Sequence, residues 1–471
     1  MPLSAKAWKH DDPKQPGFPE EFEIVKKAVL QVTDLKNNNN KYYAIELHGA
    51  AVDGMTHHRV FTHYGRTDDL DTNPDAGTKE SRYFDSAADA QKEFDRLLKA
   101  KTGPSKGYQE VALASSKIGS TKARGQSSGE LDPATIERAK AATPSTLPSE
   151  LQELVSYVYS EATDALTTTV AAKITAAGIE TPLGILTLGQ IEKGEAILDE
   201  LYHLFQAGKA TKKQLEDGSG AFYSAIPHRL GRKRDAIQAA VIDSLAQFSQ
   251  KQDTLQLMKD MLAVNGERGS VLFDSQLDQQ YRALGCELSF VPHGSPGFEE
   301  LAEYVVKSQV TKKNVRVVNV FSLKRPAEHA AFRADVGNER LLFHGSKITN
   351  WVGILSRGML MPKIVVSMGG NRTDAGWLGN GMYFTDAACT AAFYTSAGKK
   401  QTRFMAVARV ALGEVKDYTK ITYGLTAPPP GYHSTHGVRR SATVKSAFDD
   451  NEYVIYDQHQ QRLEYLVEFT A

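Results

Sequence analysis

Cysteine is nearly absent from this sequence. The 471 residues contain two, Cys286 and Cys389. Two thiols exclude a disulfide framework, and they exclude zinc fingers built on several cysteines within this chain. Reduced cysteines are typical of an intracellular protein, and we interpret both residues as small buried side chains rather than as catalytic groups.

Long apolar runs and an excess of one charge are missing as well. No run of about 18 apolar residues occurs, so the sequence predicts no membrane span. The first 21 residues lack the hydrophobic core of a signal peptide. Lys+Arg and Asp+Glu each number 56, so the formal net charge is zero and no global field attracts nucleic acid or anionic lipid. A nucleic-acid site would therefore have to be a local patch.

The composition that remains is ordinary for a soluble globular protein. Hydrophobic residues make up 41% of the chain and charged residues 24%. The length predicts about two to four domains, with enough apolar sequence for real cores. Residues 1–20 are rich in proline and charge, which predicts a disordered tail. Residues 113–146 are rich in Ser, Thr, Ala, Gly and Lys without an apolar face, which predicts a linker.

Residues 21–112 predict a small α+β domain. Two β-rich runs, at 41–49 and 58–66, are separated by a turn that contains glycine. A helix is expected after them, with Ser86 as its N-cap and Gly103 as its stop.

Residues 147–267 predict an all-α helical bundle, because apolar residues recur there at helical spacing. A capping box formed by Thr187 and Gln190 is expected to begin one helix, with each side chain bonding the other residue's backbone. A further long helix is expected over about 234–262.

Residues 274–471 predict a mixed α/β domain with antiparallel sheets, so the fold class is α+β and multidomain. In the stretch "NEYVIYD", residues 451–457, Val454 and Ile455 favour burial in a strand. Glu452 stands at the head of that strand, where a carboxylate must be exposed or paired. Two other stretches combine glycine with polar residues: "HGS" at 344–346 and "GNGMYF" at 379–384.

Each of these residues taken alone has a simpler interpretation. A histidine at a strand end is usually a hydrogen-bonded structural residue, a glutamate there is usually solvated, and tyrosines are usually part of a core. The glycine-rich run "GWLGNG", residues 376–381, has neither the dinucleotide pattern GxGxxG nor a Walker Lys-Ser/Thr pair. A Rossmann or P-loop interpretation is therefore poor.

Taken together, His344, Tyr383 and Glu452 resemble, in order and context, the H-Y-E triad of the poly(ADP-ribose) polymerase catalytic domain. The resemblance covers roughly 275–471, and the segment "LTAPPPGYHSTHGV", residues 425–438, is similar to the vault-type member of the family. The helical bundle resembles the family's regulatory domain. The N-terminal domain resembles a WGR domain, which touches DNA ends in the DNA-dependent members.

The resemblance implies that NAD is the substrate and that no metal is needed. It implies that the backbone of Gly345 binds the nicotinamide amide and that Tyr383 and Tyr394 stack on the nicotinamide ring. His344 and Ser346 would hold the adenosine-side ribose. Glu452 would hold the nicotinamide ribose, steady an oxocarbenium-like centre and activate the acceptor hydroxyl, with inversion at the anomeric carbon. The residues implied to bind NAD are His344, Gly345, Ser346, Asn350, Tyr383 and Tyr394, and the catalytic residues are Glu452, His344 and Tyr383.

The sequence also departs from the family pattern. Thr390 and Ala391 stand where the family usually has Lys and Ser beside the nicotinamide, and Asp450 stands where the best-studied elongating enzymes have Tyr. Because Asp450 replaces that Tyr, the length and branching of the polymer stay open. Residues 362–376 match the variable loop over the donor site.

DNA binding follows from the WGR resemblance, although Tyr64 replaces the motif's tryptophan. The residues implied to contact DNA are Tyr64, Arg66, Lys41 and Arg59. Residues 21–112 contain 13 Lys/Arg against 15 Asp/Glu, so a solvated charged face is the alternative. A local cationic cluster does exist, made of Lys36, Lys41, His57, His58, Arg59, His63 and Arg66.

The leading hypothesis is a polymer-forming, DNA-break-activated enzyme that modifies itself and nearby proteins in the DNA damage response. It would be nuclear in a eukaryote, or in the cytoplasm or nucleoid of a bacterium, without a membrane partner. Glycine-containing breaks at 178–184 and 218–220 would help the bundle to unfold locally. The alternatives are a mono-ADP-ribosyltransferase regulated by a protein partner, and a catalytically dead scaffold that binds DNA ends.

Overall fold

The computed structural model describes residues 6–52, 54–73, 75–120, 122, 144–170, 172–175, 178–208, 210–228, 230, 233–266, 275–361 and 376–471. The chain forms two compact units. Unit 1 comprises residues 1–136 and 166–262, and unit 2 comprises residues 137–165 and 263–471. Most of the predicted linker lies outside the described residues, as does the predicted donor-site loop at 362–376 apart from its last residue. Within the described part of the chain, no helix is both long enough and apolar enough to cross a membrane.

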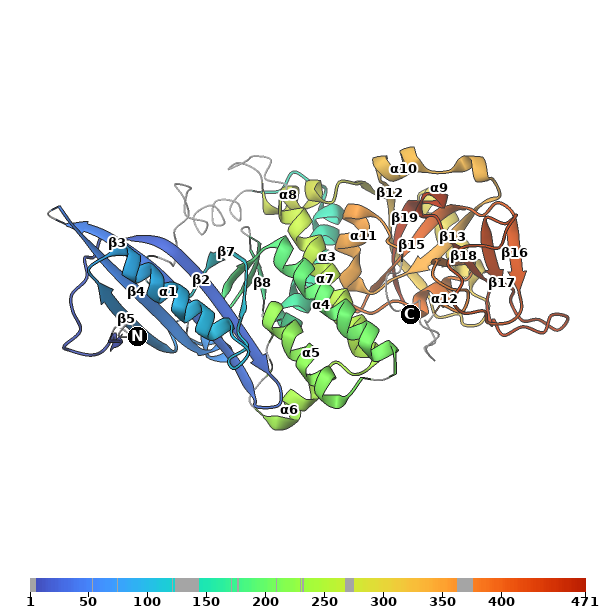
Figure 1. The fold of residues 1–471 in the computed structure, drawn as a ribbon. Coiled ribbons are helices and arrows are strands. Elements are labelled where there is room, and N and C mark those ends of the chain that lie inside the picture. The colour runs from blue at the N-terminus through green and yellow to red at the C-terminus, as the bar shows by residue number, and fades with distance from the viewer. Residues whose placement is uncertain are drawn as a thin grey trace. The chain divides into compact units, whose positions relative to one another are not determined.

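Unit 1 begins with a six-stranded antiparallel sheet in the order β1-β5-β4-β3-β2-β6, and one helix lies along a face of it (Figure 1). The elements are β1 (Trp8–Lys9), β2 (Glu23–Asp34), β3 (Asn39–Val52), β4 (Met55–Arg66), β5 (Thr78–Phe84), α1 (Ala87–Thr102) and β6 (Gln109–Glu110).

Helix α1 begins and ends where the sequence predicts. The Ser86 side chain accepts a hydrogen bond from the backbone N–H of Asp89, and the N–H of Gly103 donates to the Lys99 carbonyl. Phe94 and Leu97 are buried against β3 and β4 in one core, which makes this face of the sheet the interior of the domain.

The N-terminal residues differ from the predicted disordered tail. Trp8 and Lys9 pair with Ser81 and Glu80 as an added edge strand. The physical reason is the free edge of β5, whose backbone groups gain partners when a further segment pairs with them. Sequence composition carries no signal for such pairing.

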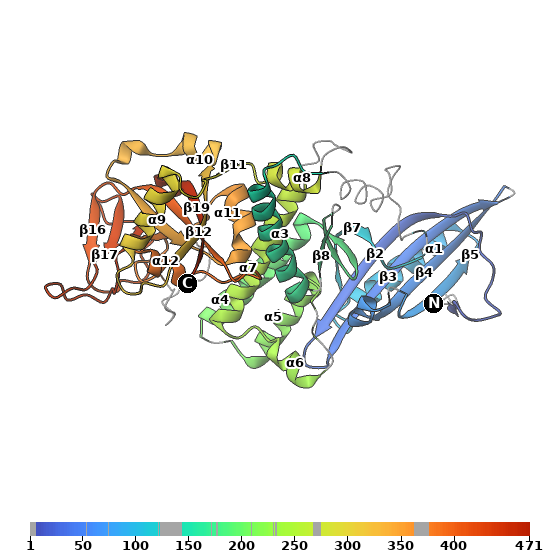
Figure 2. The same ribbon diagram turned by 180° about the vertical axis from the view of Figure 1, so that it is seen from behind.

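The rest of unit 1 is mainly helical, with α4, α5 and α7 running side by side (Figure 2). A small sheet in the order β7-β10-β9-β8 accompanies them, so the all-α prediction missed these short strands. The elements are β7 (Leu113–Ser116), β8 (Lys173–Thr175), β9 (Gly178–Thr181), β10 (Gly184–Leu186), α4 (Leu188–Gln206), α5 (Lys212–Ala225), α6 (Arg234–Ala239) and α7 (Leu245–Gly266).

The single helix predicted over about 234–262 is wrong, because α6 and α7 are separate. The Gln247 side chain donates to the carbonyls of Ala239 and Val241 and accepts from the N–H of Asp243. A side chain that bonds the backbone of the preceding turn in this way ends one helix and starts another.

Half of the predicted capping box is confirmed. The Thr187 side chain accepts from the N–H of Gln190, as an N-cap does. Gln190 does not reach back. Its Oε1 accepts from the N–H of Ala112 and its Nε2 donates to the carbonyl of Ala225, so it joins three segments of unit 1.

The predicted helix break at 218–220 is wrong, because these residues lie inside α5. The glycines serve packing there. A Cβ on Gly220 would stand 2.5 Å from the Thr33 carbonyl oxygen of β2, and one on Gly218 would stand 2.4 Å from Leu201. The Ser224 hydroxyl also accepts from the N–H of Thr33, so α5 and the N-terminal sheet are in direct contact.

Unit 2 is built on a nine-stranded sheet in the order β11-β12-β19-β15-β13-β14-β18-β17-β16, antiparallel except for the pair β16–β17. The strands are β11 (Glu287–Phe290), β12 (Arg316–Lys324), β13 (Glu339–Gly345), β14 (Met382–Thr385), β15 (Arg403–Ala411), β16 (Val415–Tyr418), β17 (Ser434–Gly437), β18 (Glu452–Ile455) and β19 (Gln461–Thr470).

The helices of unit 2 are α8 (Gln276–Ala283), α9 (Pro296–Ser308), α10 (Pro326–Ala331), α11 (Trp351–Arg357) and α12 (Ala388–Phe393), and residues 149–165 of α3 (Ser149–Val170) belong to the same unit. Among these helices, α9, α10 and α12 contact the sheet. Val305 of α9 and Ala391 of α12 pack with Phe343, Val407 and Phe469 of the central strands in one buried core.

Replacing Gly220 by alanine should destabilise unit 1, because the new methyl group meets the rigid backbone of β2. We expect a loss of about 1–3 kcal/mol and a lower urea midpoint. Gly189 is the matched control, since it is exposed near the start of α4 and its Cβ would meet nothing within 4 Å. A Gly220→Ala variant as stable as Gly189→Ala would contradict the packing role.

Candidate active site

Three neighbouring strands bring the predicted triad together. Strand β14 lies between β13 and β18, with Phe343 opposite Thr385 and Thr385 opposite Glu452. His344 and Tyr383 are therefore on adjacent strands, and Glu452 begins the third. Residues far apart in the sequence are placed by backbone pairing rather than by loops.

The His344 ring has a defined tautomer. Its Nδ1 lies 2.9 Å from the carbonyl oxygen of Tyr383, and because a carbonyl can only accept, Nδ1 carries the proton. Loss of hydration on burial lowers the pKa of His344, so the ring is neutral at physiological pH. Its Nε2 then offers a lone pair to a hydroxyl group.

Gly345 ends β13 at a close approach of two backbones. A Cβ at this position would stand 1.9 Å from the carbonyl oxygen of Ala391 in α12, so only glycine fits. Just beyond it, Asn350 Nδ2 donates to Ser346 Oγ over 3.0 Å, and the N–H of Ile348 donates to Ser396 Oγ. Two of the predicted NAD-binding residues, Ser346 and Asn350, are thus hydrogen-bonded to each other.

The two tyrosines differ in their surroundings. The Tyr383 hydroxyl donates to the Gly379 carbonyl and accepts from the N–H of Leu378, and burial raises its pKa. Tyr394 directly follows α12 and keeps 38% of its surface exposed. An exposed aromatic ring near a buried one can stack on an incoming ring.

Glu452 is an acid with a strongly shifted pKa. Burial, with a smaller contribution from the negative charge of Asp450, raises the pKa of Glu452 to about 7. A carboxyl group that titrates at this pH can serve as a proton acceptor under physiological conditions.

Asp450 is held by several donors next to this acid. It accepts from the hydroxyls of Thr390 and Thr311, the latter at 2.9 Å, and from Arg439 Nε at 3.1 Å. Its side chain is 4% exposed. Thr390 and Asp450, two departures from the family pattern, are therefore hydrogen-bonded to each other.

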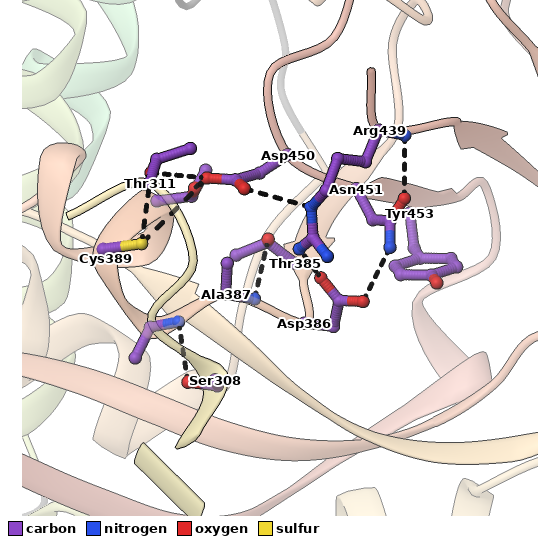
Figure 3. A network of polar contacts seen from close by, with 12 residues as sticks. Ser308, Thr311, Thr385, Asp386, Ala387, Cys389, Arg439, Asp450, Asn451 and Tyr453 are labelled. Carbon is purple, nitrogen blue, oxygen red and sulfur yellow. Dashed lines mark hydrogen bonds and ion pairs between the residues drawn. The ribbon is translucent and has the colours of Figure 1, made fainter. Parts of the chain in front are cut away.

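Further residues extend this network (Figure 3). Arg439 Nη2 donates to Asp386 Oδ1 at 2.9 Å, and its backbone N–H donates to Asn451 Oδ1. Asn451 Nδ2 in turn donates to Asp386 Oδ2 at 2.7 Å. Sequence reasoning missed Arg439, Asp386 and Thr311 as site residues, because nothing in their local pattern separates them from solvated surface residues.

Both cysteines are buried, as predicted. Cys389 lies near this network, with its Sγ 3.4 Å from Thr311 Oγ1.

Three of the four predicted DNA-contacting residues lie close together. Lys41 is opposite Arg66 in the β3–β4 pair, and Tyr64 is two residues before Arg66 on the same strand. Arg66 donates to the Asn38 carbonyl, and the Tyr64 hydroxyl donates to Glu80 at 3.0 Å. Both side chains thus already have partners within the domain.

Arg59 lies apart from that group, opposite His48 further along the hairpin. Its Nε donates to His48 Nδ1, and its guanidinium is 4.1 Å from the Phe18 ring centroid and 4.7 Å from that of Phe22. These contacts give Arg59 a packing role, and its contact with DNA stays a prediction that the geometry does not favour.

Comparison with known protein families identifies each part of the chain. Residues 295–471 match the poly(ADP-ribose) polymerase catalytic domain, residues 145–281 the poly(ADP-ribose) polymerase regulatory domain, and residues 26–114 the WGR domain. The chain belongs to the poly(ADP-ribose) polymerase (PARP) family.

Relatives share this organisation at moderate identity. The protein mono-ADP-ribosyltransferase PARP4 of Homo sapiens is 29% identical over 97% of this chain and 24% of its own. Poly [ADP-ribose] polymerase 1 of Arabidopsis thaliana is 26% identical over 95% of this chain and 47% of its own. The protein mono-ADP-ribosyltransferase PARP3 of Homo sapiens is 24% identical, over 94% and 87%. The chain thus spans about a quarter of the human PARP4 chain and about half of the Arabidopsis one.

The rate of NAD consumption should follow the ionisation of Glu452. We expect it to rise between about pH 6 and 8, because only the carboxylate can accept a proton. Asp450→Asn removes a like charge and so lowers the pKa of Glu452. The rise in rate should therefore shift to lower pH by up to about one unit. The pH profile of kcat/KM tests this, with Asp457→Asn at the other end of β18 as control. If the rate of Asp450→Asn rose at the same pH as that of the wild-type chain, the effect of Asp450 on the pKa of Glu452 would be disproved.

Glu452→Gln should stabilise the fold in alkaline solution. The pKa of Glu452 is raised in the folded state, so folding binds a proton and the unfolding free energy falls as pH rises through about 7. A neutral glutamine removes this loss, giving a gain of about 1–3 kcal/mol at pH 8.5 and little at pH 5. Urea unfolding at the two pH values measures the difference, and an equal effect at both would refute the assignment.

Proposed function

We propose that this chain is an NAD-dependent ADP-ribosyltransferase that modifies itself and other proteins and that responds to DNA. The observation that carries the proposal is the position of Glu452. It is a largely buried carboxyl group with a pKa of about 7, at the head of a strand paired with the one that carries Tyr383. A carboxyl group in this setting suits the activation of a hydroxyl acceptor.

The surrounding residues fit NAD at two points. The Nε2 lone pair of neutral His344 suits a ribose hydroxyl, with Ser346 and Asn350 as its polar neighbours. The end of β13 at Gly345 presents backbone without a side chain, which suits a carboxamide between the rings of Tyr383 and Tyr394.

NAD would supply the ADP-ribosyl group, with nicotinamide as the leaving group. Glu452 would hold the adjoining ribose hydroxyl and take the proton of the acceptor. Ala391 is buried against Gly345 and has no hydroxyl for the carboxamide, so binding there would depend on Gly345 and the tyrosines.

The response to DNA would begin in unit 1. The WGR domain and the helices α4 and α5 belong to one compact unit, joined through Thr33 and Ser224 and through Gln190. A ligand that alters the sheet would therefore act on these helices directly. Activation by DNA breaks, a role in repair and a nuclear location in a eukaryote remain part of this proposal.

Single transfer is a second candidate, set against the polymer product inferred from Glu452. The observation that favours it is the pairing of Asp450 with Thr390 and Arg439 beside the catalytic acid. Two of the relatives are named as mono-ADP-ribosyltransferases.

The test is ADP-ribose transfer from labelled NAD, with and without a short duplex that carries a 5′-phosphorylated break. We expect DNA-dependent labelling that falls at least about 100-fold in Glu452→Gln, the usual cost of losing a general base. Glu414→Gln, an exposed glutamate of the same unit, is the matched control.

Other outcomes separate the alternatives. Labelling that is indifferent to DNA would keep the transferase and reject the DNA response. DNA binding without NAD consumption would favour the catalytically dead scaffold.

A further inference from the structure

The network around Asp450 has a defined position relative to the catalytic residues. Strands β14 and β18 are antiparallel, with Tyr383 opposite Val454 and Thr385 opposite Glu452. Asp386 follows Thr385, and Asp450 precedes Glu452. Along this strand pair, Glu452 therefore lies between Tyr383 on one side and the two aspartates on the other.

This order separates the position of the leaving group from that of the acceptor. If the ring of the leaving group lies against Tyr383, the acceptor must approach the reacting carbon from the opposite face, because the transfer inverts that centre. An acceptor that reaches Glu452 from that face passes Asp386 and Asp450. This step rests on the proposed function.

The charged groups around Asp450 and Asp386 repel anions. Arg439 is the cation of the network, and it pairs with two carboxylates, through Nε with Asp450 and through Nη2 with Asp386. The described network holds two carboxylates against one guanidinium, and the partly ionised Glu452 lies beside it. A phosphate that came close would meet like charges and a guanidinium that already pairs with two carboxylates.

Two lysines lie near in sequence. Lys312 and Lys313 follow Thr311 and are exposed, so water and salt screen their charges more strongly than those of the largely buried Asp450. Their attraction for an anion is therefore the weaker effect.

We infer that Asp450 and Asp386 make the acceptor side selective for neutral or cationic segments and exclude acceptors that carry phosphate. The diphosphate of an ADP-ribose already transferred is such an acceptor. The network thereby limits the reaction to a single unit, through charge on the acceptor side rather than through a defect in Glu452.

The experiment measures chain length in self-modified protein made from labelled NAD. A phosphodiesterase that cuts the diphosphate releases AMP from single and terminal units and phosphoribosyl-AMP from internal units. The wild-type chain should yield almost only AMP. Asp450→Asn and Asp386→Asn should each raise the phosphoribosyl-AMP share about two- to five-fold, the effect of one partly screened charge.

Two features guard against a merely structural effect. The share is a ratio within each sample, so a change in overall rate cancels. Salt should raise the phosphoribosyl-AMP share in the wild-type chain, because it screens the repulsion between the aspartates and phosphate. It should have less effect in a variant that carries both Asp450→Asn and Asp386→Asn. Asp457→Asn is the matched control, since it makes the same change at the other end of β18, beside Arg333.

The outcomes are distinguishable. Long chains from the wild-type protein, or a share that both aspartate variants leave unchanged, would overturn the inference and leave the transferase intact. A rise in both variants with no change in Asp457→Asn would support it. Absence of NAD consumption under every condition would reject the proposed function itself, and this inference with it.

Discussion

Backbone hydrogen bonding between β13, β14 and β18 is the constraint on which the site depends. It fixes His344 beside the carbonyl of Tyr383 and sets Glu452 opposite Thr385. Because these contacts are made by strands inside a nine-stranded sheet, the site inherits the rigidity of the core. The absence of a side chain at Gly345 completes the arrangement, since the end of β13 can then meet the backbone of α12.

The parts predicted from sequence are those in which a local pattern reports a local structure. Apolar residues at helical spacing indicated the helices of residues 147–267, and the three conspicuous short stretches lie at β13, β14 and β18. The network of Asp450 could not be found in this way. Its donors Thr311 and Arg439 stand 139 and 11 residues away in sequence, and each is a common surface residue whose role comes only from tertiary placement.

The helical part of unit 1 shows the opposite case, in which a local signal was present and tertiary packing overrode it. Glycines at 218 and 220 are typical of a helix break, yet they lie in α5 because the neighbouring Leu201 and β2 leave no room for a side chain. Gln190 has the spacing of a capping box, yet its amide accepts from the N–H of Ala112 and donates to the buried carbonyl of Ala225 instead. Leaving those groups unpaired would cost more than the cap gains.

Two of the departures from the family pattern, Thr390 and Asp450, are best understood as one coupled change. The Thr390 hydroxyl donates to Asp450, so a carboxylate at that position has a partner supplied by α12, and Arg439 balances its charge. Without these donors, burying a polar side chain next to Glu452 would carry a large desolvation cost. The negative charge of Asp450 also acts on Glu452 through space. Thr390, which stands where the family usually has Lys beside the nicotinamide, thus holds the carboxyl group that we propose acts on the acceptor.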